Sequence, residues 1–254
     1  MPAEVTEDAV LGGRLRLKQP RHGHRVGHDA ILLAAACPAR AGERAVDLGA
    51  GIGAAGLALA VRVDGAKVTL VEVDADLAAL ATANAQVNGL AARVGSVVLD
   101  AAAPARAFAA AGLGPESIAR VLMNPPFHDP ARQRASPDRQ RRLAHVAPGG
   151  TLPAWIRTAA RLLRPRGTLT MIWRADGLAE VLRALGSAFG AATVLPIHPR
   201  PGEAAIRVLV RATKASHAPL SLLPGFVLND HAGRPTAEAE AVLRGGAALP
   251  LSEL

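Results

Sequence analysis

The fold of this chain depends on one short stretch, Asp47-Leu48-Gly49-Ala50-Gly51-Ile52-Gly53. The apolar residues around its start predict a strand over 44–48, and the small residues after it predict a helix over 54–63. A strand, a glycine turn and a helix in that order open a βαβ unit, in which glycines let a ligand approach the backbone and the helix N-terminus offers free N–H groups. The spacing Gly-x-Gly-x-Gly, with an acid two residues ahead, differs from the Gly-x-Gly-x-x-Gly of dinucleotide-binding proteins.

Two further predicted strands also end in an acidic residue. Residues 67–71 lead into Glu72, about 20 residues past the glycines, where an acid commonly binds ribose hydroxyls. Residues 93–99 lead into Asp100. Because the carboxyl ends of parallel strands meet at one edge of a sheet, we expect these acids to lie along the same edge as Asp47. Each acid alone could instead be a helix cap or a solvated residue.

A fourth strand is predicted where Val121-Leu122-Met123 leads into Asn124-Pro125-Pro126-Phe127. Prolines lack the N–H donor of a sheet ladder, so the chain leaves the sheet at Asn124. This places an amide, two rigid carbonyls and an aromatic ring at the carboxyl end of a strand, where open α/β sheets bind their ligands. The long polar segment 128–150 follows, and we expect it to be a substrate-binding lid.

The remaining pattern completes a sheet flanked by helices. Helices are predicted over 30–36, 75–87, 152–163, 176–185 and 235–244, and strands over 168–173, 192–197 and 206–212. A short loop joins the last two strands, so they must be antiparallel. Asp74 and Asp76 are expected to cap the helix 75–87, and Asn88-Gly89 to end it.

Residues 9–28 predict a small β-hairpin that turns at Gly12-Gly13. One face of it is expected to be basic, with the residues Arg14, Arg16, Lys18, Arg21 and Arg25. The triplet His22, His24 and His28 has only Asp29 as a nearby ligand of another type. We therefore expect solvated or phosphate-facing histidines and no bound metal.

Composition favours a nucleic-acid partner. The 254 residues hold 29 Lys and Arg against 21 Asp and Glu, a net charge of +8, and such a balance attracts polyanions. The single cysteine, Cys37, excludes an internal disulfide and a multi-cysteine zinc site. The N-terminus has no apolar signal core, and no apolar run is long enough to cross a membrane. We therefore expect a cytoplasmic protein that does not bind membranes.

The motifs at the successive strand ends resemble those of the class I S-adenosylmethionine-dependent methyltransferases: Asp47 to Gly53, Glu72, Asp100 and Asn124-Pro125-Pro126-Phe127. The resemblance implies a Rossmann-like α/β fold with a seven-stranded, mostly parallel sheet, an antiparallel last strand and helices on both faces. It implies a methyltransferase domain over 29–213. Residues 1–28 would be a basic hairpin extension, and 214–254 a C-terminal appendage packed on the same domain.

The resemblance also implies the cofactor S-adenosyl-L-methionine, with S-adenosyl-L-homocysteine as product, and no metal. Asp47 and the turn residues Gly49, Ala50, Gly51 and Gly53 would hold the methionine moiety. Glu72 would bind the ribose and Asp100 the adenine amino group, while Val73 and Ala101 would flank the adenine ring. Asn124 would lie beside the methyl donor.

The sequence Asn-Pro-Pro-Phe marks the members of this class that methylate a planar, conjugated nitrogen: adenine N6, cytosine N4, guanine N2 or a glutamine amide. Such a nitrogen is a poor nucleophile because its lone pair is delocalised. The Asn124 side-chain oxygen and the Pro125 carbonyl could accept hydrogen bonds from the N–H groups of this nitrogen. These bonds would direct its lone pair toward the sulfonium methyl. Pro126 would help to fix these acceptors, and Phe127 could stack on the base.

Within this class the chain is most similar to the tRNA1(Val) adenine-N6 methyltransferase family, which modifies the adenine next to the anticodon. The similarity lies in residues 11–17, 27–33 and 220–224. It implies tRNA as the partner, bound by the basic residues of the hairpin and by Arg139, Arg141 and Arg142. The chain departs from the family at Ala50, where Cys is common, and at Phe127, where Tyr is frequent.

Three alternatives stay open on sequence alone. A glutamine-amide methyltransferase acting on a protein such as a release factor has the same Asn-Pro-Pro motif. A nucleotide-binding Rossmann module could use a nicotinamide cofactor or perform no chemistry. A catalytically silent RNA-binding protein could keep all the motifs without turnover.

Overall fold

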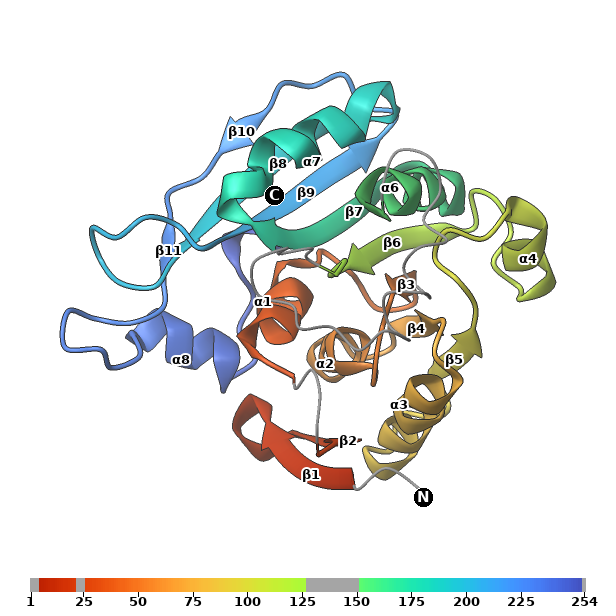
Figure 1. Ribbon diagram of the computed structural model, residues 1–254, viewed down its shortest axis with the longest axis horizontal. Coiled ribbons are helices and arrows are strands. Elements are labelled where there is room, and N and C mark those ends of the chain that lie inside the picture. The colour runs from red at the N-terminus through yellow and green to blue at the C-terminus, as the bar shows by residue number, and fades with distance from the viewer. Residues whose placement is uncertain (1–4, 22–25, 127–150, 253–254) are drawn as a thin grey trace, which may run out of the picture.

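The computed structural model describes residues 5–21, 26–126 and 151–252. These residues form a nine-stranded sheet and a separate two-stranded hairpin (Figure 1). The order in the large sheet is β10-β8-β9-β7-β6-β3-β4-β5, with β11 also beside β8. Its seven main strands are β3 (Arg44–Leu48), β4 (Lys67–Glu72), β5 (Val94–Val98), β6 (Ile118–Met123), β7 (Leu163–Arg174), β8 (Phe189–His198) and β9 (Arg207–Lys214).

Strand β9 gives the sheet its mixed character. The pairs β3–β4, β3–β6, β4–β5 and β6–β7 are parallel, whereas β9 is antiparallel to both of its neighbours, β7 and β8. The predicted class I methyltransferase fold is therefore confirmed. The sheet also contains two short strands that the sequence pattern did not predict, β10 (Ser221–Leu222) and β11 (Phe226–Val227), and both pair in parallel with β8.

Helices cover both faces of the sheet (Figure 1). One face carries α1 (His28–Ala36), α2 (Ala54–Arg62) and α3 (Ala75–Val87), and the other carries α4 (Ala105–Ala110), α6 (Thr151–Leu162) and α7 (Leu178–Leu185). The buried side chains accordingly form two clusters, one on each face. α8 (Ala237–Leu243) packs beside α1. Across the described ranges, none of the helices has the length and apolar character needed to span a membrane.

Cap residues set the ends of two helices. Asp74 begins α3, because its side chain accepts hydrogen bonds from the N–H groups of Asp76 at 3.0 Å and Leu77 at 3.3 Å. Gly89, with a φ of +67°, follows the end of α3 as expected. The hydroxyl of Thr236 begins α8 in the same manner. Short 3-10 helices cover Leu11–Gly13, Ala175–Gly177, Gly186–Ala188 and Pro250–Ser252.

The N-terminal hairpin consists of β1 (Val5–Val10) and β2 (Leu15–Pro20), so it begins earlier than the predicted residue 9. Leu15 and Leu17 are fully buried in the core cluster that also holds α1 and α2. Their burial packs the hairpin against the helices of that face (Figure 1). Glu7 lies opposite Lys18 in the register. The face predicted to be basic, with Arg16 and Lys18, therefore also carries one acidic side chain, Glu7.

Leu17→Ala tests whether the hairpin belongs to the cooperative folding unit. We expect the free energy of unfolding in urea to fall by about 2–5 kcal/mol, because the substitution leaves a cavity in the core. Val5→Ala, at a 47% exposed position of the same hairpin, should change it by no more than about 0.5 kcal/mol. Equal, small effects of both substitutions would mean that the hairpin can detach without unfolding the domain.

Candidate functional site

The carboxyl ends of four parallel strands bring the candidate site residues to one edge of the sheet. Leu48 pairs with both Val71 and Met123, so the chain leaves β3 and β6 at adjacent points. Asn124 is therefore a neighbour of the glycine turn. On the other side, Glu72 pairs with Val98, which brings the end of β5 next to the end of β4.

The turn after β3 is built from glycines in the left-handed conformation. The φ angles are +72° at Gly49, +56° at Gly51 and +87° at Gly53, values that side chains disfavour. The N–H groups of Gly49 and Ala50 donate to the carbonyl of Val71 at 2.8 and 2.9 Å. A Cβ atom added at Gly51 would meet nothing within 4 Å. This part of the turn is therefore open to a ligand.

Glu72 fixes the turn from the end of β4. One carboxylate oxygen accepts a hydrogen bond from the N–H of Gly51 at 2.7 Å, and the other accepts one from the N–H of Asp74 at 2.9 Å. The residue is only 7% exposed. Since a carboxylate has about four lone-pair positions, Glu72 can still accept hydrogen bonds from ribose hydroxyls.

Asp47 is buried behind the turn and caps α2. Its Oδ2 atom accepts a hydrogen bond from the N–H of Gly56 at 2.8 Å, a group in the first turn of α2 that the N-cap residue Gly53 has no side chain to satisfy. Burial raises the pKa of Asp47 to about 7, the hydrogen bond from Gly56 opposes this rise, and the charge of Glu72 adds to it. The sequence pattern left both a ligand role and a helix-capping role open for Asp47, and the structure shows the capping contact.

The end of β5 supplies a more exposed part of the edge. Asp100 is exposed, and its Oδ1 atom accepts a hydrogen bond from the N–H of Ala102 at 2.7 Å. Ala101 is buried in the second core cluster. Val73, which follows the end of β4, is 64% exposed, and such exposure is unusual for a large apolar side chain. An apolar group beside exposed polar ones suits a flat, partly polar ligand.

Asn124 carries the unsatisfied polar atom of this edge. Its Oδ1 atom is buried and accepts no hydrogen bond from the residues that the structure describes. A buried acceptor without a donor costs about 1–3 kcal/mol, so an N–H group of a ligand would be bound favourably there. Pro125 is buried and Pro126 half-buried, whereas Phe127 lies outside the described residues.

Trp155 of α6 is a further site residue that sequence reasoning read only as part of the helix core. A Cβ atom added at Gly49 would overlap the six-membered ring of Trp155. The indole is half-buried and packs against the second core cluster. Trp155 therefore covers the start of the glycine turn next to Asn124. The only signal in the sequence was the glycine itself, since 106 positions separate the two residues.

The basic residues predicted to bind RNA do not lie at the carboxyl ends of the parallel strands. Arg14 donates to the carbonyl of Gly245 at 2.8 Å, and Arg16 lies 3.6 Å from the carboxylate of Glu7. Lys18 and Arg21 are on the same hairpin. Outside the described residues lie Arg25, Arg139, Arg141, Arg142, His22, His24 and the predicted lid 128–150. The RNA-binding role of all these residues stays a prediction.

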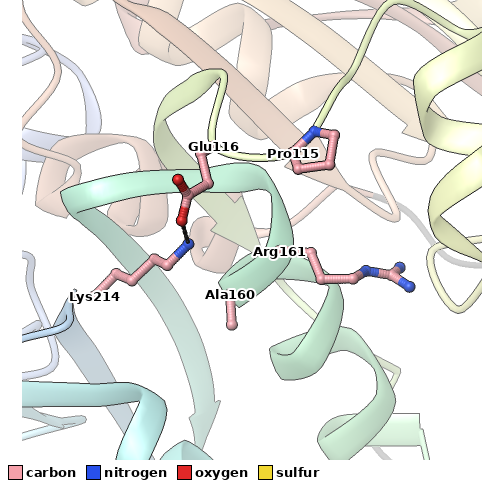
Figure 2. Close-up of a pocket in the computed structure, with 5 residues that line it drawn as sticks. All are labelled: Pro115, Glu116, Ala160, Arg161 and Lys214. Carbon is pink, nitrogen blue, oxygen red and sulfur yellow. Dashed lines mark hydrogen bonds and ion pairs between the residues drawn. The ribbon is translucent and has the colours of Figure 1, made fainter.

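A hollow of about 470 Å³ lies at the amino ends of the parallel strands, on the side of the sheet away from the candidate site. It is lined by Pro115, Glu116, Ala160, Arg161 and Lys214. Figure 2 shows Lys214 and Glu116 pointing toward each other, and their charged atoms are 2.9 Å apart. The guanidinium of Arg161 donates to the carbonyl of Ala103 at 2.9 Å. These charged groups are satisfied within the protein, so the hollow lacks the unpaired polar group that Asn124 provides.

The strand-end edge fits S-adenosylmethionine, the cofactor that the fold implies. The open glycine turn can approach the methionine moiety, Glu72 has lone pairs for the ribose, and Val73 and Asp100 offer an apolar and a polar contact for the adenine. The Asn124 oxygen, to which no described residue donates, lies beside this turn. Together with the order of the strands, this edge defines a class I methyltransferase.

The chain belongs to the methyltransferase small domain family, whose model matches residues 24–198. The prediction of a methyltransferase family that uses S-adenosylmethionine is confirmed. The match covers β3 to β8 and therefore includes all of the strand ends described above.

Three known proteins show what the chain is similar to. The release factor glutamine methyltransferase of Chlorobaculum tepidum is 36% identical over 156 residues, 59% of this chain and 52% of that protein. The tRNA1(Val) (adenine(37)-N6)-methyltransferase of Porphyromonas gingivalis is 32% identical over 164 residues, 62% and 61% respectively. The chain thus spans less than two thirds of either relative. The crystal structure of a predicted O-methyltransferase, Atu636 of Agrobacterium tumefaciens, has 34% identity and a TM-score of 0.74, covering 87% of this chain and 98% of that one.

Asp47→Asn should remove a pH dependence of stability. The pKa of Asp47 is raised in the folded protein, so between about pH 4 and pH 7 the folded state binds more protons than the unfolded state, and stability falls as the pH rises. Asparagine cannot ionise and keeps an oxygen for the N–H of Gly56. In urea titrations the variant should gain stability relative to the natural protein from pH 5 to pH 7 and no more above pH 8. A difference independent of pH would show that Asp47 ionises normally.

Gly49→Ala tests the contact with Trp155. The substitution should destabilise the protein through both the left-handed φ and the overlap with the indole. In a Trp155→Ala background only the backbone cost should remain, so the effect on the free energy of unfolding should shrink by about 1–3 kcal/mol. Gly51→Ala is the matched control, since its φ is also positive but its Cβ would be free. Its effect should be the same in both backgrounds, and a similar result for Gly49→Ala would contradict the contact.

Proposed function

We propose that this protein is an S-adenosylmethionine-dependent N-methyltransferase whose substrate is adenine N6 in tRNA, next to the anticodon, and that it acts in the cytoplasm. The observation that carries the proposal is the buried Oδ1 atom of Asn124 beside the glycine turn, to which no described residue donates a hydrogen bond. An exocyclic amine has N–H donors for this oxygen. The bound cofactor would supply the methyl group as a sulfonium substituent.

The residues of this edge favour methylation of nitrogen over oxygen. A hydroxyl acceptor generally needs a base that removes its proton, and the amide of Asn124 cannot act as one. Asp47 and Glu72 are buried and already bonded to backbone N–H groups. A conjugated amine needs only acceptors that hold its N–H groups and free its lone pair. The Asn124 side chain and the Pro125 carbonyl would be these acceptors, fixed by Pro126, with Phe127 stacking on the base.

Within the proposed site, the cofactor contacts follow from the order of the strand ends. The glycine turn with Gly49, Ala50, Gly51 and Gly53 would hold the methionine moiety, with Asp47 fixing the helix behind it. Glu72 would accept the ribose hydroxyls. Val73 and Ala101 would flank the adenine ring, and Asp100 would accept a hydrogen bond from its amino group.

A tRNA substrate is supported by charge and by similarity. The net charge of +8 favours a polyanion. The relative from Porphyromonas gingivalis, named for tRNA, aligns over more of its own length than the relative from Chlorobaculum tepidum. We propose that the basic residues of the hairpin and Arg139, Arg141 and Arg142 contact the phosphates.

Glutamine-amide methylation of a protein is the second candidate, because the relative with that name has the higher identity, 36% against 32%. A side-chain amide also presents two N–H groups to Asn124 and Pro125. The two substrates are distinguished by incubating the protein with methyl-labelled cofactor and either total tRNA or a purified release factor. We expect label in the tRNA, recovered as N6-methyladenosine after digestion. Label only in the protein would establish the second candidate and reject the first.

Asn124→Ala should reduce methyl transfer by about 10²–10³-fold, because one preorganised acceptor for the reacting amine is lost. Binding of S-adenosylhomocysteine, measured by titration calorimetry, should change little. Asn124→Asp keeps an acceptor oxygen at the same place and should retain more transfer than the alanine variant. Unchanged transfer by Asn124→Ala in the label assay would reject the proposed role of this amide.

A further inference from the structure

Two asparagines, Asn84 in the last turn of α3 and Asn88 at its C-cap, bind the outer edge of the N-terminal hairpin. The Oδ1 atom of Asn84 accepts a hydrogen bond from the N–H of Lys18 at 2.7 Å, and its Nδ2 atom donates to the carbonyl of the same residue at 3.0 Å. Asn88 repeats the pattern with Arg16, at 2.9 and 2.7 Å. The two side chains thus pair with β2 as a neighbouring strand would.

Asn84 makes one contact that Asn88 does not. Its Nδ2 atom also donates to the carbonyl of Ile52 at 3.0 Å. The side chain is completely buried, and its oxygen and its two N–H groups are each used once. Asn84 therefore connects three segments: the hairpin, α3 and the glycine turn.

The position of Ile52 makes this connection relevant to ligand binding. Ile52 lies between Gly51 and Gly53, which both have positive φ and no side chains to hold them. Gly51 is bonded to Glu72 on one side of the turn. The bond from Asn84 fixes the next peptide group. Ordering a glycine turn costs a large amount of conformational entropy. Contacts that order the turn before the ligand arrives therefore favour ligand binding.

We propose that Asn84 is a positioning residue for the cofactor: it holds the glycine turn in its binding conformation and makes the N-terminal hairpin part of the cofactor site. The inference rests on the proposed function only in that the turn binds S-adenosylmethionine or its product. Asn84 itself touches the backbone of the turn and needs no contact with the ligand.

Asn88 is the matched control for a merely structural role. Both residues bind the backbone of β2 through an acceptor and a donor, but only Asn84 reaches the turn. Aspartate keeps the shape and the acceptor oxygen at either position and removes the N–H donors. Asn84→Asp and Asn88→Asp therefore both weaken the attachment of the hairpin. The first also releases the carbonyl of Ile52, whereas the second also releases the carbonyl of Asn84, to which Asn88 Nδ2 donates at 2.7 Å.

The test is titration of each variant with S-adenosylhomocysteine in a calorimeter, at a temperature well below its unfolding midpoint. Asn84→Asp should raise the dissociation constant about tenfold, the size expected when a buried carbonyl loses its donor. Asn88→Asp should lower the unfolding midpoint without changing the dissociation constant. If Asn84→Asp does not fold, Asn84→Ser and Asn88→Ser take the place of the pair, since serine is smaller and uncharged.

The outcomes separate the positioning role from its alternatives. Equal increases in the dissociation constant for the two positions would assign the effect to the hairpin as a whole and overturn the proposal, as would an unchanged constant for the Asn84 variant. Failure of the natural protein to bind S-adenosylhomocysteine would instead reject the proposed function, and the cofactor role of Asn84 with it.

Discussion

The backbone of residues 49–53 crosses the edge of the sheet with three glycines in left-handed conformations. Inside the turn, the N–H of Gly53 donates to the carbonyl of Ala50 at 2.8 Å. The other fixed points come from outside. The carbonyl of Val71 binds the start of the turn, Glu72 binds its middle, and Asn84 binds the peptide group that follows. The shape of the turn is therefore a consequence of how β4 and α3 pack against β3 and α2.

The polar groups around the turn divide into those that build the site and those left for a ligand. Asp47 is buried and bonded to the first turn of α2, and Glu72 ties two backbone segments together while keeping lone pairs in reserve. The oxygen of Asn124 differs from both because no described residue donates to it. A rigid frame of satisfied groups with one unsatisfied acceptor is an arrangement suited to orienting an amine.

The sequence allowed the strand ends to be predicted because parallel strands, glycines and prolines impose local rules. The antiparallel β9 followed from a loop too short for a crossover, and Asp74 was recognisable as a cap from its position before α3. The contacts of Asn84, Asp47 and Trp155 could not be predicted, since each depends on packing between distant segments. Two-residue strands such as β10 have no periodicity to detect, and α4 lies in an alanine-rich segment whose pattern does not separate a helix from a loop.

The order in which the chain is synthesised leaves the hairpin without its partner for a time. β1 and β2 are made first, yet the side chains that bind the outer edge of β2 follow 66 and 72 residues later. Until α3 emerges, the buried faces of Leu15 and Leu17 and the free edge of β2 are exposed together, which is the combination that favours pairing with another chain. The positively charged side chains of Arg16 and Lys18 lie on this edge strand itself, and charge on an edge strand opposes pairing with another chain.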